Sequence, residues 1–510
     1  GIKEYEDFFE IEFECASERF DEAMIKRLVK HYIALLQSCV TTPHYPISEL
    51  KMMDKKEIDS ILYGFNSPVV LSKEHSYPVF HWVEESMTKF CENIALVSGD
   101  DYITYMELES KVNSLAYEIQ KRGIGSNHVV AILLTDQVET IISVLAVMKA
   151  GAAFLVIDNR FPFARVKQLL YDANPTAVLT CNELVQQLTD LSYQCISINE
   201  AGAVLYQEPV CTNVSLEDAA YIIYTSGTTG IPKGILVSNQ QLSNQILASL
   251  KDIPYHAQTK HIFTIDFSFD PFIQVILCIL CSGGCLHLVS KELIMDVDAF
   301  YGYVEKHGIN SMDMVPSLLS THLAGKVFRQ KLKLEILALA GEVFSDTLYR
   351  RITACFDVKA LFNIYGPAET VVNTTIYRCT DDNVGLFVPI GRPMHNYCVY
   401  ILDKHLRPLP VNVEGEIFIS GISVSLGYLN QQEQTSEKFI DNPFISGLKM
   451  YRTGDIGKWL PDGNIVFLGR NDSMVKIRGI RMEVNEIQKS IQDYPGVKFV
   501  VVIPYKELPV

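Results

Sequence analysis

A loop rich in glycine and hydroxyl side chains, ending in a lysine, is the segment of this sequence best suited to chemistry. It spans residues 224–234 and follows the apolar run 219–223. Glycines let backbone N–H groups approach phosphate oxygens, hydroxyl groups donate further hydrogen bonds, and a lysine supplies a compact positive charge. The spacing is not that of a P-loop, which has four residues between its first glycine and Gly-Lys-Ser/Thr. The loop therefore predicts a polyanion site and disfavours a P-loop kinase or GTPase.

Further motifs follow this loop in a fixed order. The first are Asn363-Ile364-Tyr365-Gly366-Pro367-Ala368-Glu369-Thr370 and Gly415-Glu416-Ile417 with Gly427-Tyr428-Leu429. Then come Tyr451-Arg452-Thr453-Gly454-Asp455, Gly469-Arg470-Asn471-Asp472 and Lys476-Ile477-Arg478-Gly479. Together with the loop they closely resemble the adenylate-forming superfamily, and within it the amino-acid adenylation domains of nonribosomal peptide synthetases. The resemblance covers residues 68 to 510, nearly all of the chain.

The resemblance implies a reaction in two steps. A substrate carboxylate attacks the α-phosphate of ATP, which gives an acyl-adenylate and pyrophosphate. The phosphopantetheine thiol of a separate peptidyl carrier protein domain then displaces AMP to form a thioester. ATP and Mg²⁺ are therefore the expected cofactors. Because two anions must meet, the site needs charge neutralisation and fixed geometry more than acid–base chemistry.

The resemblance also assigns the phosphate end of the nucleotide site. The residues expected to hold the leaving pyrophosphate are Thr225, Ser226, Gly227, Thr228, Thr229, Gly230 and Lys233. Glu369 is the expected magnesium ligand, since a hard cation favours a carboxylate beside phosphate oxygens. Capping of a helix after Gly366-Pro367 is the alternative role for Glu369. Thr225, Lys233 and Glu369 form the expected catalytic set.

The ribose and adenine ends follow from the later motifs. Asp455 is expected to accept hydrogen bonds from the ribose hydroxyls, with help from Arg470. Tyr365, beside Gly366, would stack on adenine, and Asn363 would bind its amino edge. The opposite wall is expected to consist of Gly341, Glu342 and Val343.

Asp270, preceded by Phe269, indicates the substrate class. Family members that activate α-amino acids carry an aspartate here, which pairs with the substrate ammonium group. The family's specificity positions fall on Asp270, Pro271, Gln274, Asp313, Ala338, Ala340, Ile364, Val372 and Asn373. The pair Gln274 and Asp313 best suits a glutamine side chain, which both donates and accepts. A basic side chain (Arg, Lys or ornithine) on Asp313 is one alternative, and a largely apolar pocket is another.

Alternation of apolar runs with helical patterns predicts an α/β fold with layered parallel sheets. Strands are expected at 129–134, 153–157 and 177–180, and helices at 139–150 and 163–172. The adenylation core is assigned to residues 68–471, with a β-rich part, which the resemblance makes a small distorted barrel, at about 385–471.

The two ends of the chain have their own predictions. Residues 1–67 look like the tail of an upstream condensation domain with its linker, including an amphipathic helix at 16–38. A helical extension of a stand-alone enzyme is the alternative. Residues 472–510 look like the start of a mobile C-terminal lobe that rotates at Asp472. This lobe is expected to be truncated, because no motif matches its late catalytic lysine. Adenylation should then be slower by about 10²–10³.

The charge balance narrows the function classes. With 44 Lys and Arg against 60 Asp and Glu, the net charge of −16 argues against non-specific binding to nucleic acid or anionic membrane. The N-terminal residues lack a signal-peptide pattern, so a cytoplasmic location is expected. A stand-alone acyl- or aryl-CoA ligase and a non-catalytic binding module remain the alternative functions.

Overall fold

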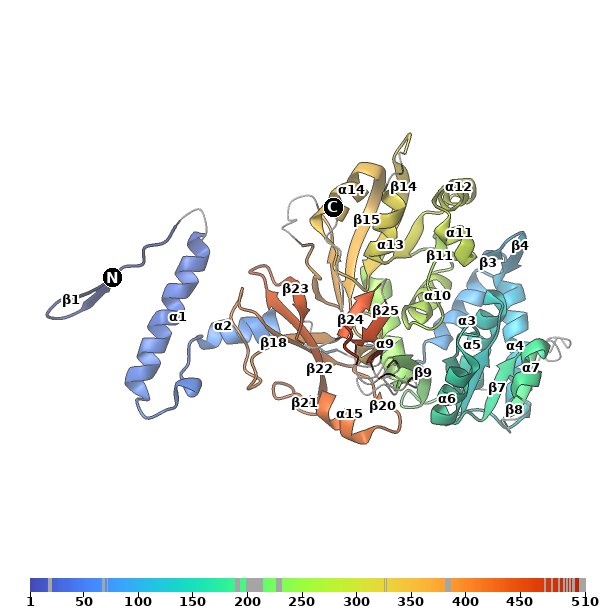
Figure 1. The fold of residues 1–510 in the computed structure, drawn as a ribbon, viewed down its shortest axis with the longest axis horizontal. Coiled ribbons are helices and arrows are strands. Elements are labelled where there is room, and N and C mark those ends of the chain that lie inside the picture. The colour runs from blue at the N-terminus through green and yellow to red at the C-terminus, as the bar shows by residue number, and fades with distance from the viewer. Residues whose placement is uncertain are drawn as a thin grey trace.

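Two large sheets with helices between them carry most of the chain (Figure 1). The computed structural model describes residues 1–16, 21–66, 69–70, 72–188, 193–198, 214–225, 232–324, 326, 328–380, 387–471, 474–477 and 480–484, and several positions between 487 and 503. The predicted α/β class with layered sheets is confirmed.

The first sheet has seven strands in the order β20-β10-β9-β6-β5-β7-β8. Their bounds are β5 (Val129–Leu133), β6 (Ala153–Val156), β7 (Ala177–Thr180), β8 (Gln194–Ser197), β9 (Ala219–Thr225), β10 (Lys233–Ser238) and β20 (Gly427–Tyr428). The three strands predicted from the apolar runs are present to within one residue. Side chains alternate across this sheet, because Val130 and Ile132 face the other sheet while Ala131 and Leu133 contact the outer core around α6 (Phe163–Ala173).

The second sheet has nine strands in the order β17-β16-β15-β14-β13-β11-β12-β3-β4. Their bounds are β3 (Ile94–Ser98), β4 (Asp101–Thr104), β11 (Lys260–Phe263), β12 (Cys285–Leu288), β13 (Ser311–Met314), β14 (Leu332–Ala340), β15 (Phe356–Tyr365), β16 (Thr375–Arg378) and β17 (Arg392–Pro393). The strands from β15 through β3 run parallel, so their carboxyl ends lie along one edge.

The main core lies between these two sheets. It includes α3 (Phe80–Lys89), α4 (Tyr105–Lys121), α5 (Gln137–Ala150), α9 (Asn239–Asp252) and α10 (Pro271–Cys281). Nine of the eleven residues of α10 are buried, as expected for a helix that is apolar on every side. On the outer face of the second sheet, α12 (Val297–His307), α13 (Pro316–Leu323) and α14 (Asp346–Cys355) complete a second core.

A third, antiparallel sheet forms the β-rich region. It contains β18 (Tyr397–Leu402), β19 (Gly415–Gly421), β21 (Phe439–Asp441), β22 (Lys449–Trp459) and β23 (Ile465–Arg470). It curls without closing into a complete barrel, because β18 and β23 pair with no strand on their outer side within the described residues. A hairpin turn at 461–464 joins β22 to β23, and Gly463 adopts a φ of +82° there.

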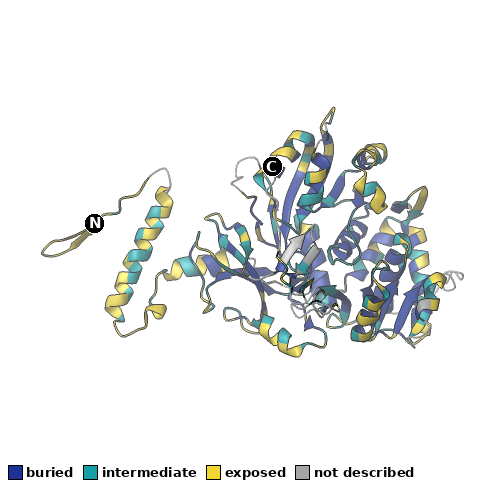
Figure 2. Ribbon diagram, in the orientation of Figure 1, coloured by how far each residue is buried: buried dark blue, intermediate teal, exposed yellow. Residues whose placement is uncertain are grey.

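The N-terminal segment differs from the rest of the chain. Helix α1 (Glu22–Thr41) has no buried residue and stands apart with exposed and half-exposed side chains (Figures 1 and 2). The predicted start at residue 16 is wrong, because the Asp21 carboxylate caps the helix by accepting from the Met24 amide at 2.6 Å. Beyond α2 (Lys55–Asp59), Ile61 and Leu62 pack into the cores of the β-rich sheet. Within the described residues, no helix combines the length and apolar character needed to cross a bilayer.

Candidate active site

A cleft of about 1170 Å³ lies at the carboxyl ends of strands from both large sheets. This is where α/β proteins commonly bind ligands. All nine predicted amino-acid-pocket residues line it: Asp270, Pro271, Gln274, Asp313, Ala338, Ala340, Ile364, Val372 and Asn373. Five predicted nucleotide-site residues line it as well: Thr225, Gly341, Gly366, Asp455 and Arg470. The two predicted half-sites therefore share one cavity.

The phosphate end is built on the hairpin of β9 and β10. Thr225 and Lys233 are direct partners across this antiparallel pair, so both ends of the predicted phosphate loop are held together. The Thr225 hydroxyl is buried and has no hydrogen-bond partner in the described part of the chain. The predicted residues Ser226, Gly227, Thr228, Thr229 and Gly230 lie outside the described residues.

Tyr428 connects the other two predicted catalytic residues. The Nζ of Lys233 lies 5.2 Å from the centroid of the Tyr428 ring, and the Tyr428 hydroxyl donates to Glu369 Oε1 at 3.0 Å. Both Lys233 and Glu369 are buried beside the cleft rather than lining it. No role was predicted for Tyr428, and its place in the motif Gly427-Tyr428-Leu429 was the available signal.

Glu369 sits in the short turn η5 (Ala368–Thr370). No side chain caps this turn, so the alternative capping role for Glu369 is not what the structure displays. The described residues contain no group of three His, Cys, Asp or Glu side chains that could hold a metal by themselves. One carboxylate still fits Mg²⁺, which commonly binds one or two carboxylates together with substrate phosphates. Glu369 would then hold the ion that neutralises phosphate charge.

At the ribose end, both carboxylate oxygens of Asp455 have hydrogen-bond partners. Both oxygens of the buried Asp455 carboxylate accept hydrogen bonds at 2.5 Å, Oδ2 from the Tyr365 hydroxyl and Oδ1 from Arg470 Nη1. Thr453 holds the same turn, because its hydroxyl accepts from the Asp455 amide at 2.9 Å and donates to the Ile417 carbonyl. Burial, followed by the charge of Asp455, raises the pKa of Tyr365 well above its ordinary value. Asp455 is thus held rigidly as an acceptor.

The adenine contacts remain predictions. The Tyr365 ring packs near Phe467, with the centroids 6.1 Å apart, and lies outside the cleft lining. Asn363 donates its amide protons to the Val388 and Pro389 carbonyls, which orients its oxygen as an acceptor. On the opposite side, Glu342 accepts from the Ser317 amide at 2.8 Å, and Val343 is half exposed.

The amino-acid end contains one oriented amide and one poorly satisfied carboxyl. Asn373 Nδ2 donates to Gln274 Oε1 at 3.2 Å, while Gln274 Nε2 faces the weakly accepting Cys278 sulfur at 3.8 Å. Asp313 is partly exposed to the cleft, yet its Oδ1 is buried without a hydrogen-bond partner among the described residues. Burial raises the pKa of this carboxyl to about 7.

Tyr255 lies close to that carboxyl and was missed by sequence analysis. Burial, followed by the charge of Asp313, raises the pKa of the Tyr255 hydroxyl well above its ordinary value. That hydroxyl is also buried without a hydrogen-bond partner in the described chain. Tyr255 lies in the loop after α9, which contains none of the motifs, and it does not line the cleft. Asp270, at the start of α10, similarly raises the pKa of the buried Tyr221, after the larger effect of burial.

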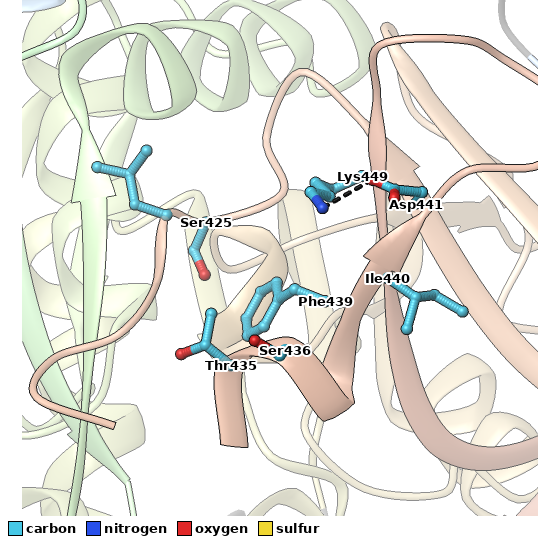
Figure 3. Close-up of a pocket in the computed structure, with 8 residues that line it drawn as sticks. Ser425, Thr435, Ser436, Phe439, Ile440, Asp441 and Lys449 are labelled. Atoms are coloured by element: carbon cyan, nitrogen blue, oxygen red, sulfur yellow. Dashed lines mark ion pairs between the residues drawn. The ribbon is translucent and has the colours of Figure 1, made fainter. Parts of the chain in front are cut away.

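A smaller hollow lies at the edge of the β-rich region (Figure 3). It has a volume of about 370 Å³ and is lined by Ser425, Leu426, Thr435, Ser436, Phe439, Ile440, Asp441 and Lys449. Its ion pair between Lys449 and Asp441, at 2.7 Å, is solvent-exposed. None of the predicted site residues lies there, so the large cleft is the candidate active site.

The fold agrees with the comparisons to known proteins. The chain belongs to the family of AMP-binding enzymes, whose model matches residues 83–429, more than half of the chain. Its resemblance to nonribosomal peptide synthetases is confirmed by curated relatives. It is 33% identical over 519 residues to gramicidin S synthase 2 of Brevibacillus brevis, and this match covers 98% of this chain and 11% of that protein.

Solved structures give the same result. The chain matches holo-AB3403, a four-domain nonribosomal peptide synthetase bound to AMP and glycine, with a TM-score of 0.80 and 26% identity. That match covers 94% of this chain and 35% of the other. The fold is also that of NpsA-ThdA, an artificially fused adenylation-PCP di-domain from Klebsiella oxytoca, with a TM-score of 0.76, 23% identity and 86% coverage of each chain.

Proposed function

We propose that this chain activates an α-amino acid, with glutamine as the preferred substrate, in nonribosomal peptide synthesis. ATP and the amino acid would form aminoacyl-AMP and pyrophosphate, and the aminoacyl group would pass to carrier-protein phosphopantetheine. The observation that carries this proposal is the shared cleft, where nine predicted pocket residues lie beside Thr225 and Asp455. The carrier step is supported by the fold shared with an adenylation-PCP di-domain.

Charge neutralisation at the phosphate end supports the first step. Lys233 and Glu369 both contact Tyr428, and Thr225, which lines the cleft, has a buried hydroxyl with no hydrogen-bond partner in the described chain. With Mg²⁺ held at Glu369, these groups would offset the charge of the leaving pyrophosphate. Asp455 would bind the ribose and so fix the α-phosphate relative to the incoming carboxylate.

The hydrogen bonds at the far end favour glutamine. Because Asn373 occupies Gln274 Oε1, the Gln274 nitrogen is the group available to donate to a substrate carbonyl. Asp313 Oδ1 is an acceptor with no partner in the described chain, so it suits the substrate's amide N–H. One donor and one acceptor match a primary amide. Asp270, at the start of α10, would pair with the substrate ammonium group.

A basic amino acid is the second candidate substrate. A cation beside Asp313 would also satisfy that carboxyl, and it would return the pKa of about 7 toward the ordinary value. ATP–pyrophosphate exchange across the proteinogenic amino acids and ornithine distinguishes glutamine from a basic amino acid as the substrate. Exchange driven by glutamine supports the proposal. Exchange driven by arginine or ornithine overturns the substrate, and exchange driven only by a fatty or aryl acid favours the ligase alternative.

The domain division is also part of the proposal. Residues 1–67 would be a condensation-domain tail and linker, residues 68–471 the adenylation core, and residues 472–510 the start of the mobile lobe. The exposed surface of α1 supports a separate N-terminal segment, although Ile61 and Leu62 already pack into the β-rich sheet. The hinge residue Asp472 lies outside the described residues. Comparing the exchange rate of this chain with that of a longer protein tests whether a late lysine accelerates adenylation.

A further inference from the structure

Val371 and Val372 form a strained turn in the wall of the amino-acid pocket. Their φ angles are +58° and +65°, in the left-handed region that β-branched residues rarely adopt. The Asn373 amide donates to the Val371 carbonyl at 2.9 Å, which closes a three-residue turn around Val372. Such a turn with positive φ is rare, and it persists only where its surroundings hold it in place.

This turn determines what the pocket presents to a substrate. Val372 and Asn373 both line the cleft, and the Asn373 side chain orients Gln274. The turn also packs tightly against Gly366, where an added Cβ would lie 2.1 Å from the Val372 carbonyl oxygen. A relaxed turn would therefore move a wall of the pocket and release the Gln274 amide.

Gln245, on α9, stabilises the turn through hydrogen bonds of its side-chain amide. Its amide satisfies its neighbours when the nitrogen faces the turn, 3.1 Å from the Val371 oxygen and 2.8 Å from the Asn373 oxygen. The amide oxygen then accepts from the Ser249 hydroxyl at 3.2 Å. Gln245 is fully buried and does not line the cleft.

Tyr397, at the start of β18, completes this support. Its hydroxyl contacts the Gln245 amide and lies 3.1 Å from the Thr370 carbonyl oxygen, to which it donates. Both side chains are fully buried, so water cannot replace these hydrogen bonds. One helix between the sheets and one strand of the β-rich region therefore support the same turn, through the carbonyl oxygens of Thr370, Val371 and Asn373.

We infer that Gln245, supported by Tyr397, is a positioning residue that sets amino-acid discrimination without touching the substrate. The inference rests on the proposed function of the cleft. We expect Gln245 to act on the amino-acid end, because its own hydrogen bonds reach the turn, Tyr397 and Ser249 but no predicted nucleotide-site residue.

The test is Gln245→Met, which keeps the side-chain length but removes both polar atoms. With the full-length protein, the KM for glutamine in pyrophosphate exchange should rise about 10–100-fold. The KM for ATP should change less than about twofold, and the preference for glutamine over other amino acids should fall. Ser243→Ala is the matched control, a fully buried polar residue of the same helix whose hydroxyl has no partner in the described chain.

Two results would overturn the inference. One is an unchanged KM for glutamine, with or without lower thermal stability, and the other is an equal rise in both KM values. Tyr397→Phe replaces Gln245→Met if the latter does not fold, with the same expected split. If the wild-type protein exchanges with no amino acid, the proposed function fails instead. A crystal structure of Gln245→Met then decides the inference, because relaxed φ angles at Val371 and Val372 support it and an unchanged turn contradicts it.

Discussion

The carboxyl groups at the two ends of the cleft differ in their hydrogen bonding. At the ribose end, Asp455 is bonded on both oxygens, to Tyr365 and to Arg470. At the amino-acid end, Asp313 Oδ1 has no hydrogen-bond partner within the described residues. A bonded carboxylate stabilises the empty protein, whereas an unbonded one costs stability until a ligand pairs with it. The comparison indicates a preformed nucleotide end and an amino-acid end that depends on its substrate.

The largest expected effect on stability is that of removing the Asp455 carboxylate at the ribose end. Asp455→Ala removes the carboxylate partner of the largely buried Arg470 side chain and leaves its hydrogen bond to the Thr453 carbonyl, which should lower the free energy of unfolding by about 3–5 kcal/mol. Urea denaturation of the ligand-free protein measures this loss. Asp441→Ala removes a solvent-exposed ion pair with Lys449 and should change the same quantity by less than about 1 kcal/mol. Equal losses in the two variants would contradict a special role for the bonded end.

Replacing the carboxyl group at the amino-acid end, that of Asp313, should raise the stability of the ligand-free protein instead of lowering it. The pKa of Asp313 is raised from 3.8 to about 7, so the folded state resists ionisation of this carboxyl. The stability of the ligand-free protein should therefore fall as the pH rises from about 4 through about 7. Asp313→Asn should remove this dependence and stabilise the protein at pH 8 by up to about 4 kcal/mol. Urea denaturation between pH 5 and pH 8 measures both effects, and destabilisation at pH 8 would refute the proposed contrast.

Two tyrosine-to-phenylalanine variants, one at each end of the cleft, test the same comparison with smaller expected effects on stability. Tyr365→Phe removes a hydrogen bond to the Asp455 carboxylate and should cost about 1.5–3 kcal/mol of stability. Tyr255→Phe removes a hydroxyl with no hydrogen-bond partner in the described chain, so its cost should stay below about 1 kcal/mol. The two unfolding free energies, determined under one condition, give the comparison. A cost at Tyr255 equal to that at Tyr365 would show that the amino-acid end is bonded as well.

The smallest expected effect concerns the pH dependence of substrate binding. Glutamine carries no side-chain charge, so its KM in pyrophosphate exchange should change less than about threefold between pH 6 and pH 8. A basic substrate would instead bind about tenfold more tightly at pH 8, because Asp313 ionises near pH 7. The KM of glutamine and of ornithine, each measured at both pH values, tests this. A strong pH dependence with glutamine would contradict its assignment to Asp313 and Gln274.

Much of the fold could be predicted because its signals are local. The apolar run 129–134 and the helical pattern 139–150 became β5 and α5 (Gln137–Ala150) almost without change. The start of α1 was placed too early, since a single capping carboxylate at Asp21 outweighed the apolar periodicity. The nine pocket positions came from the family resemblance; all nine line one cleft, and their role in binding the substrate stays a prediction.

Contacts between segments far apart in the chain could not be predicted in the same way. Tyr365 and Asp455 are separated by 90 residues in the chain, and Gln245 and Tyr397 by 152. Tyr428 contacts Lys233 because β20 pairs with β10, a strand almost two hundred residues earlier, and its hydroxyl also reaches Glu369. Such contacts depend on how the sheets and helices pack, and one sequence contains no periodic pattern that reports this packing.

The sequence by itself determined the family, several strands and helices of the first large sheet and the residue types available for the chemistry. The tertiary structure decided which of these residues are bonded before a ligand arrives. It pairs Asp455 with Tyr365 and Arg470, and it leaves Asp313 Oδ1 without a hydrogen-bond partner in the described chain. The physical reason is that propensity and periodicity act over a few residues, whereas burial and hydrogen bonding of a polar group depend on segments from the whole chain.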